Sequence, residues 1–438
     1  MGAQLLGIEG TQVKIEVTID LSRSMLTSEE QIQASLNEAG SIATMSALKY
    51  LDTDGSAIKI AGAVMRTKGE QSKAYQTPYG EVIVNRHVYQ RSGGGKTYCP
   101  MERDARIIMT STPFFAKQVS SKLAYGSARE VQRDLSENHA RAVAVSYIQR
   151  VSEAVASIIE AKEESWNYVP PQLEVEIHSV AIGLDGTCML MCETGWREAM
   201  VGTISLYDID GERQHTIYIG ATPEYGKASF LDRLEREIER TKARYPKAIY
   251  IGIADGAASN WQFLNQHTSQ QILDFYHASG YLGAVATALY PQDVNQQKQW
   301  LIQSCHQLKH EAGAAMRLYE QMAQLSQSDT QTKAIQEKLN AAVTYFHNHL
   351  HQMNYSDYRG QAYPIGSGVT EAACKTVIKQ RLCCSGMRWK ETGAAVVLSL
   401  RALALTPTRW NQFWVSSTNM GFLSPFNCIE LRSHPRKC

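Results

Sequence analysis

Two apolar runs, each followed by an Asp-Gly pair, constrain the fold of this chain more than any other feature. They span residues 178–184, before Asp185, and residues 248–254, before Asp255. Short continuous apolar runs that stop at turn residues are typical of buried strands in α/β proteins. The sequence therefore predicts an α/β fold with an aspartate at the end of two strands. Either aspartate alone could also be only a turn former.

The segments around these runs predict the order of one domain. Strand-like runs at residues 201–207 and 215–220 follow the first, and an amphipathic helix around residues 230–238 follows them. The second run comes next, and residues 271–274 form a further short strand. Three strands, a helix and two more strands is the order of a ribonuclease-H-like α/β domain. From about residue 295 to 350 apolar residues recur at helical spacing instead, which predicts an all-helical insertion.

The length of 438 residues is about three times the ~150 residues of one average domain. We therefore expect two or three compact units, each with a sizeable core. The predicted segments are an N-terminal helix and β-hairpin region (1–110), a helical DNA-binding region (111–170), the ribonuclease-H-like core (171–290), the helical insertion (291–355), a last catalytic helix with a basic segment (356–412) and a tail with little order (413–438).

Glu371 is the candidate for a third acid. It follows a loop rich in glycine and hydroxyl groups, residues 364–370, and lies in the first turn of a predicted helix. Lys375 and Lys379 follow at i+4 and i+8, so they share its helix face. These lysines are predicted to hold a phosphate backbone. On its own, Glu371 could also be a helix N-terminal acid that interacts with the helix dipole.

Three acids from separate elements suit a two-metal site. Carboxylates can hold two hard divalent cations about 3.5–4 Å apart, one activating the attacking oxygen and the other stabilising the leaving oxygen. The sequence thus predicts that Asp185, Asp255 and Glu371 bind two Mg²⁺ ions, which Mn²⁺ can replace, and catalyse phosphoryl transfer.

Residues 127–156 have the outline of a helix-turn-helix. A capping box at residues 127–130 starts a short helix, a polar break is expected at residues 136–139, and apolar residues at helical spacing mark a second helix. An ordinary helical hairpin would show the same pattern. In a helix-turn-helix the second helix enters the major groove of double-stranded DNA. The polar residues predicted to contact DNA are Ser146, Tyr147, Gln149 and Arg150.

The N-terminal region is expected to contain a helix and a hairpin. A Ser-x-x-Gln capping box that begins at Ser28 predicts a helix to about Leu51. Alternating valines predict a β-hairpin over residues 79–100, with its tip at residues 92–95.

Charge and composition limit the class of protein and the compartment in which it is expected. The 44 basic residues nearly balance 43 acidic ones, yet residues 375–409 carry a local net charge of +6, from seven basic residues and one acid. Nine scattered cysteines favour reduced thiols over a disulfide framework. No apolar run reaches the ~18 residues that a membrane span needs, so we expect a soluble protein that does not act at a membrane.

Four sequence blocks carry a resemblance: IGLDGT, IADGAASNW, DFYHASGYL and YPIGSGVTEAACKTVIKQRL. They resemble the ISKra-type insertion-sequence transposases, which are Mutator-like, acidic-triad recombinases. The resemblance covers most of the chain up to about Trp410 and places Asp185, Asp255 and Glu371 on the family's three acids. It implies a bacterial cytoplasmic, nucleoid-associated transposase that acts as a homo-oligomer on DNA. Such an enzyme binds the terminal inverted repeats of its element, cleaves there and joins the 3′-OH ends to target DNA.

Two further pairs of residues are candidates for this function. Asp274 and His277 match the Mutator-like signature of Asp or Cys, two residues and then His, and are expected to support the site rather than bind metal. Arg388 is expected to contact a DNA phosphate. Trp389 either stacks on a displaced base or packs in the core. Two other functions stay open, a structure-specific nuclease without strand transfer and a DNA-binding regulator that does not cut.

Overall fold

The protein's structure, a computed structural model, describes residues 2–60, 62–163, 168–224, 227–327 and 332–419. Its mixture of helices and strands confirms the predicted α/β class. The chain divides into two compact units. The first consists of residues 1–167, 395–404 and those from 410 on, and the second of residues 168–394 and 405–409. The predicted segments 171–290 and 291–355 thus belong to one unit, whereas segment 356–412 is divided between both.

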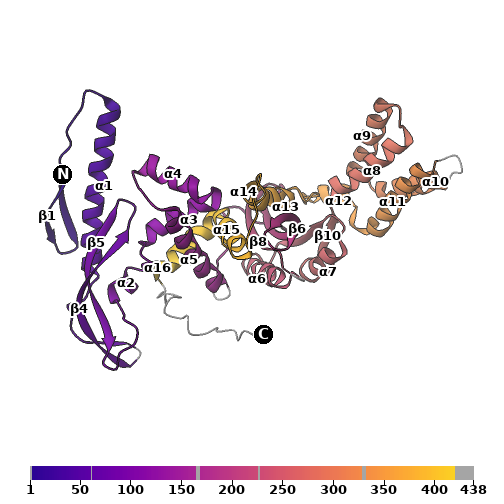
Figure 1. The fold of residues 1–438 in the computed structure, drawn as a ribbon. Coiled ribbons are helices and arrows are strands. Elements are labelled where there is room, and N and C mark those ends of the chain that lie inside the picture. Colours follow the sequence, from indigo (N-terminus) through magenta and orange to yellow (C-terminus); the bar gives the residue numbers. More distant parts are fainter. Residues whose placement is uncertain (1, 61, 164–167, 225–226, 328–331, 420–438) are drawn as a thin grey trace. The chain divides into compact units, whose positions relative to one another are not determined.

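A five-stranded mixed sheet is the centre of the second unit (Figure 1). Its strand order is β10-β9-β6-β7-β8. β7 is antiparallel to both β6 and β8, whereas β9 is parallel to β6 and β10 is parallel to β9. The strands are β6 (Ser179–Met191), β7 (Gly195–Tyr207), β8 (Arg213–Ala221), β9 (Ile249–Ala254) and β10 (Gln270–Leu273).

β6 does not end at Asp185, so that part of the sequence prediction was wrong. Only its parallel pairing with β9 stops near there, at Gly183, whereas its antiparallel pairing with β7 continues to Met191. The backbone groups on the β7 side keep their hydrogen-bond partners, and the strand therefore continues past the Asp-Gly pair. Asp185 consequently lies in the middle of a long strand, at the point where one neighbouring strand leaves it.

Helices cover both faces of this sheet (Figure 1). α6 (Ala228–Arg244) and α7 (Ala258–His267) lie on one face, and α6 buries the predicted apolar stripe fully. α13 (Gly368–Ala373) lies on the other face and continues through a π-helix, η2 (Cys374–Lys379), into α14 (Gln380–Leu382). The stripe consists of Phe230, Leu234 and Ile238.

Between β10 and α13 the described residues are helical, as the spacing of apolar residues predicts. α8 packs against α9 and α11, and α10 packs against α11. The elements are α8 (Phe275–Leu289), α9 (Val294–His310), α10 (Ala314–Ser326), α11 (Lys333–His349), the 3₁₀ helix η1 (Leu350–Gln352) and α12 (Tyr355–Gly360).

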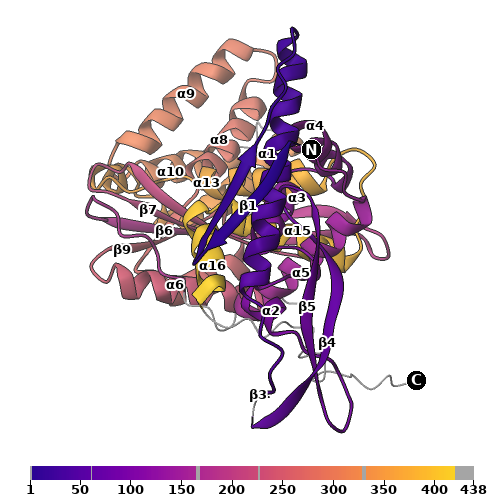
Figure 2. The ribbon, with the colours of Figure 1, turned by 90° about the vertical axis from the view of Figure 1, so that its left-hand side faces the viewer.

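The first unit holds the N-terminal sheets and a group of helices. α1 (Met25–Tyr50) packs along the hairpin of β1 (Ala3–Glu9) and β2 (Gln12–Val17), as Figure 2 shows. The other elements are β3 (Ile58–Ile60), β4 (Ala63–Gln76), β5 (Glu81–Arg91), α2 (Pro100–Asp104), α3 (Pro113–Tyr125), α4 (Ala128–His139) and α5 (Val145–Glu163). Near the C-terminus come α15 (Glu391–Ala404) and α16 (Pro407–Asn419).

Two predictions for the N-terminal region need correction. Ser24 caps α1, whereas Ser28 is buried inside the helix, where its hydroxyl bonds to the backbone of Ser22. The hairpin is formed by β4 and β5 with its turn at residues 77–80, because β4 is a largely polar strand that no apolar alternation marks. The expected tip at residues 92–95 is followed by only one bridge to β5.

The described part of the predicted tail, residues 413–419, is helical rather than poorly ordered. α16 continues to Asn419, because Trp410, Phe413 and Trp414 bury their rings. The remainder of the predicted tail, residues 420–438, lies outside the described residues. None of the helices in the described ranges is long and apolar enough to cross a membrane.

Candidate functional site

Three aspartates lie at the same level of the sheet, where the parallel pairing of β6, β9 and β10 ends. The last parallel pair of β6 and β9 is Gly183 beside Ile253, and each strand reaches an aspartate two residues later. β10 extends the row, since the backbone N–H that follows it donates to the carbonyl of the last residue of β9 at 2.9 Å. Neighbouring strands lie about 4.8 Å apart, so the backbones of aspartates on adjacent strands lie close together. They are Asp185, Asp255 and Asp274.

Glu371 reaches the site from α13, which rests directly on the sheet. The Thr370 hydroxyl bonds to the Thr203 hydroxyl at 2.7 Å in a buried position. Gly183 permits this approach, because a Cβ there would lie 2.1 Å from Thr370 Oγ1. A glycine in β6 and two threonines therefore fix the first turn of the helix, and the exposed Glu371 is the next residue along it.

An open cavity of about 600 Å³ joins this helix to β6. Glu371, Lys375 and Lys379 all contribute to its lining, as their spacing predicts, and Asp185 faces them from the strand. Asp255 does not line this cavity. The other lining residues are Gly186, Thr187, Cys374 and Gln380.

Cys374 is a contact of the site that sequence reasoning missed. It begins the π-helix directly after α13, and its thiol donates a hydrogen bond to Asp185 Oδ2 at 3.4 Å. Burial, together with the Asp185 carboxylate, raises the pKa of the Cys374 thiol well above its usual value, so the thiol stays a proton donor at neutral pH. In sequence it looks like any core cysteine in a helix. The wider turn of a π-helix, common at functional sites, was not detectable either.

Asp274, His277 and Glu371 form a tight group. Ligand atoms of the three side chains lie within 4.8 Å of one another. The buried Asp274 carboxylate caps α8 by accepting the His277 backbone N–H at 2.8 Å. Its other oxygen accepts the Ser367 backbone N–H at 2.5 Å and also bonds to the Ser367 hydroxyl. Asp274 therefore ties α8 to the loop before α13, and Ser367 Oγ in turn lies 3.0 Å from Glu371 Oε1.

The turn that carries Asp255 is held by α11. The Tyr345 hydroxyl donates to the Asp255 carbonyl oxygen at 2.7 Å, and the Asp255 carboxylate accepts the Ala257 backbone N–H at 3.1 Å. Gly256 has φ +107°, and a Cβ there would meet His349 Nε2 at 3.0 Å. Both the backbone conformation and this close approach require glycine, which explains the second Asp-Gly pair.

The predicted triad shares only Glu371 with the group whose ligand atoms lie within 4.8 Å of one another, which among the described residues is Asp274, His277 and Glu371. Within the described residues, Asp185, Asp255 and Glu371 each accept only one or two hydrogen bonds. An ionised carboxylate offers about four acceptor positions, so lone pairs remain for a metal ion. Oxygen donors of this kind suit hard cations such as Mg²⁺.

Arg388 and Trp389 lie beyond α14 in the same unit. The half-buried Trp389 donates its indole N–H to the Leu382 carbonyl at 2.8 Å, and the Arg381 guanidinium lies over its ring at 5.4 Å. Its backbone also bridges to the end of β6. These contacts give Trp389 a packing role, and its stacking on DNA remains a prediction. Arg388 is exposed.

The predicted helix-turn-helix corresponds to α4 and α5. The capping box at Ser127 is present, but α4 runs to His139, so the break falls at residues 140–144 rather than 136–139. The polar residues extend the helix because they lie on its exposed side, and Ala140 ends it in the left-handed conformation with φ 51°. Three of the predicted DNA contacts on α5 are exposed, whereas Tyr147 is half-buried and bonds to Thr110 at 3.1 Å. The exposed three are Ser146, Gln149 and Arg150.

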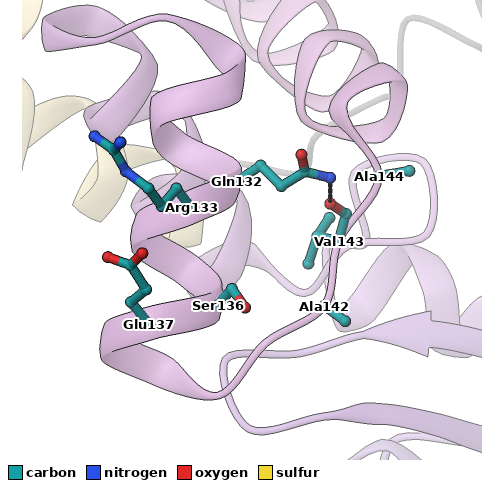
Figure 3. A pocket seen from close by; sticks show the side chains of 7 residues that line it. All are labelled: Gln132, Arg133, Ser136, Glu137, Ala142, Val143 and Ala144. Carbon is teal, nitrogen blue, oxygen red and sulfur yellow. Dashed lines mark hydrogen bonds between the residues drawn. The ribbon is translucent and has the colours of Figure 1, made fainter.

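A cavity of about 550 Å³ opens between α4 and this turn (Figure 3). Gln132 spans it and donates its amide N–H to the Val143 carbonyl at 2.8 Å. This bond fixes the turn that leads into α5. The residues that line the cavity are Gln132, Arg133, Ser136, Glu137, Ala142, Val143 and Ala144.

No protein-family model matches this chain, and no curated protein matches it either.

Proposed function

We propose that this protein is a DNA transposase whose second unit is a ribonuclease-H-like catalytic domain. The sheet supports this fold: numbered within the domain, its strands are ordered 3-2-1-4-5, with only the second antiparallel to the rest. The observation that carries the proposal is the meeting of acids and lysines where the parallel pairing of β6 and β9 ends. Asp185 and Asp255 each lie two residues after the last parallel residue pair of the adjacent strands β6 and β9. Glu371 shares a cavity with Asp185, Lys375 and Lys379.

Asp185, Asp255 and Glu371 would hold two Mg²⁺ ions, which Mn²⁺ can replace. When bound, such ions activate an attacking oxygen and stabilise the leaving oxygen of an in-line displacement. Lys375 and Lys379 hold the phosphate backbone beside these acids. Cys374 and Asp274 act through other groups: the thiol orients Asp185, and the buried carboxylate fixes the loop that leads to Glu371.

The reaction consists of two phosphoryl transfers at one site. In the first, water attacks the phosphorus at the element end, the bond from phosphorus to the 3′ oxygen breaks, and a 3′-OH is released. In the second, this 3′-OH attacks a phosphorus of target DNA and displaces another 3′ oxygen. Neither step needs a covalent enzyme intermediate, so the protein only has to position the groups and stabilise charge.

The first unit would supply recognition of double-stranded DNA. In this proposal α5 enters the major groove of the terminal inverted repeats, where Ser146, Gln149 and Arg150 are exposed. Two ends have to be brought together for joining, so we propose a homo-oligomer assembled on DNA in the bacterial cytoplasm, at the nucleoid.

Purified protein incubated with labelled element ends, Mg²⁺ and a target plasmid tests the proposal. Labelled ends joined to the plasmid are the expected product. Cleaved but unjoined ends would instead indicate a structure-specific nuclease, and bound but uncut ends a DNA-binding regulator.

A further inference from the structure

Gly280 has no structural reason to be glycine. It lies in the interior of α8 and is exposed, and its φ is not positive. A Cβ built on it would have no heavy atom within 4 Å. Glycine destabilises a helix interior relative to alanine, because it loses more backbone freedom on folding. The empty space above Gly280 is therefore a candidate for function.

This space is part of an open notch of about 380 Å³ along one face of α8. Two tyrosines and a histidine border it, and Tyr276 is 64% exposed. The Tyr276 ring therefore offers an accessible aromatic face beside the empty position. The lining residues are Tyr276, His277, Gly280, Tyr281 and Ala284.

Both rings are fixed by the segments that carry the acids. Tyr281 stacks on Tyr345, with ring centroids 4.0 Å apart and an interplanar angle of 16°, and the Tyr345 hydroxyl donates to the Asp255 carbonyl. Tyr276 lies against Gly366 of the loop before α13, where a Cβ would come within 2.9 Å of its ring. The walls of the notch are thus preorganised, which lowers the entropic cost of binding a flat group between them.

The notch also adjoins the acids directly. His277 borders it and, at the same time, belongs to the group in which its ligand atom lies within 4.8 Å of Asp274 and Glu371. A strand whose phosphate lies beside Glu371 would therefore bring a neighbouring base to the notch.

We propose that this notch, formed by Tyr276, His277, Gly280, Tyr281 and Ala284, binds an unpaired nucleobase next to the cleaved phosphate. The inference rests on the proposed DNA function and adds that the strand is locally unpaired at the site. Aromatic side chains stack on bases of any sequence, and Gly280 leaves room for the flat ring. A protein partner would need a much larger contact than one helix face provides.

Photocrosslinking with 5-iodouracil tests the notch. One probe is an element-end duplex with iodouracil beside the cleavage position, and the other is a short single-stranded oligothymidylate with one iodouracil. We expect both to crosslink to the peptide that contains Tyr276 and Tyr281, as mapped by mass spectrometry. Gly280→Leu should reduce this crosslink about tenfold, since it fills the notch and removes one stacking contact.

The variants separate blocking from misfolding. Leucine is a better helix former than glycine and its Cβ would have no heavy atom within 4 Å, so Gly280→Leu should unfold at the same or a higher temperature than wild type. Thr287→Leu adds the same side chain to an exposed position of α8 outside the notch and should crosslink as wild type does.

The outcomes also separate this inference from the transposase proposal. In one outcome, no DNA is cut but the oligothymidylate still crosslinks at the notch in a Gly280-dependent way. This result would support base binding at the notch and contradict the transposase proposal. Crosslinks elsewhere, or an unchanged crosslink in Gly280→Leu, overturn the notch even if cleavage is normal. A change only in oligomeric state would identify the face as a protein contact and also overturn it.

Discussion

Among the individual residues, Cys374 donates a hydrogen bond from its neutral thiol to the candidate catalytic acid Asp185. Its thiol contacts Asp185 Oδ2 from the first position of the π-helix. A carboxylate that accepts such a bond has a fixed orientation, which a two-metal site requires. The same contact raises the pKa of the Cys374 thiol, because a negatively charged sulfur would face a negatively charged carboxylate in a partly buried position.

Cys374→Ser should change how stability depends on pH. The thiol has a pKa near 9.0 when unfolded and a higher pKa when folded, so only the unfolded state loses the proton at moderately alkaline pH. The wild type's stability relative to Cys374→Ser should therefore be constant below pH 9 and fall as the pH rises above it. Thermal unfolding of both proteins from pH 7 to 10 measures this. A constant difference across the range would show that the thiol is not held protonated by the fold.

Gly183 is the residue that lets α13 approach the sheet. Gly183→Ala should destabilise the protein by about 1–3 kcal/mol, because the new methyl overlaps Thr370 Oγ1. Adding Thr370→Ala removes that oxygen and should recover part of the loss. Denaturant unfolding of both single variants and the double variant measures the coupling. Additive losses would mean that the two positions do not touch.

At the element scale, the site depends on how α13 and η2 lie on β6 and β7. Glu371, Lys375 and Lys379 line one cavity although the helix between them changes to π geometry. Lys375 and Lys379 therefore lie in the same cavity as two of the candidate acids, Asp185 and Glu371.

Replacing both Lys375 and Lys379 by alanine should slow cleavage of bound DNA. The two lysines line the cavity with Glu371, so they should act on the phosphate during the reaction and not only on affinity. Single-turnover cleavage at saturating enzyme should fall by about tenfold or more. If only the concentration needed for saturation rises, the lysines form a peripheral patch.

Arg150 on α5 tests the recognition element. If α5 reads bases, Arg150→Ala should weaken binding to element ends by about 1–3 kcal/mol more than binding to random DNA. Competition binding at two salt concentrations measures the ratio. An equal loss on both DNAs with a smaller salt slope would indicate a phosphate contact instead.

The candidate acids were predicted from local sequence pattern, and their role in catalysis remains a prediction. Asp185 and Asp255 were found because apolar runs precede them, and Glu371 because of the loop before it. The continuation of β6 past Asp185 was not predictable, since it depends on pairing with β7 rather than on its own residues. The contact from Cys374 was missed for the same kind of reason, because it depends on tertiary packing.

At the scale of the whole molecule, the proposed recognition helices and the proposed catalytic acids belong to different compact units. α4 and α5 lie in the first unit, and all three candidate acids lie in the second. The C-terminal chain contributes to both, since residues 395–404 and those from 410 on belong to the first unit and residues 405–409 to the second. Removal of the chain after α14 would therefore damage both functions.

The proposed function requires that Asp185, Asp255 and Glu371 catalyse phosphoryl transfer on DNA. The most direct test is to measure end binding and end cleavage in parallel for Asp185→Asn, Asp255→Asn and Glu371→Gln. Each substitution removes an anionic metal ligand with little change in shape, so cleavage should fall by about 100-fold or more while binding stays near the wild-type level. Cleavage near the wild-type rate in any one variant would contradict the assignment of that residue, and near-wild-type cleavage in all three would contradict the proposed catalytic function.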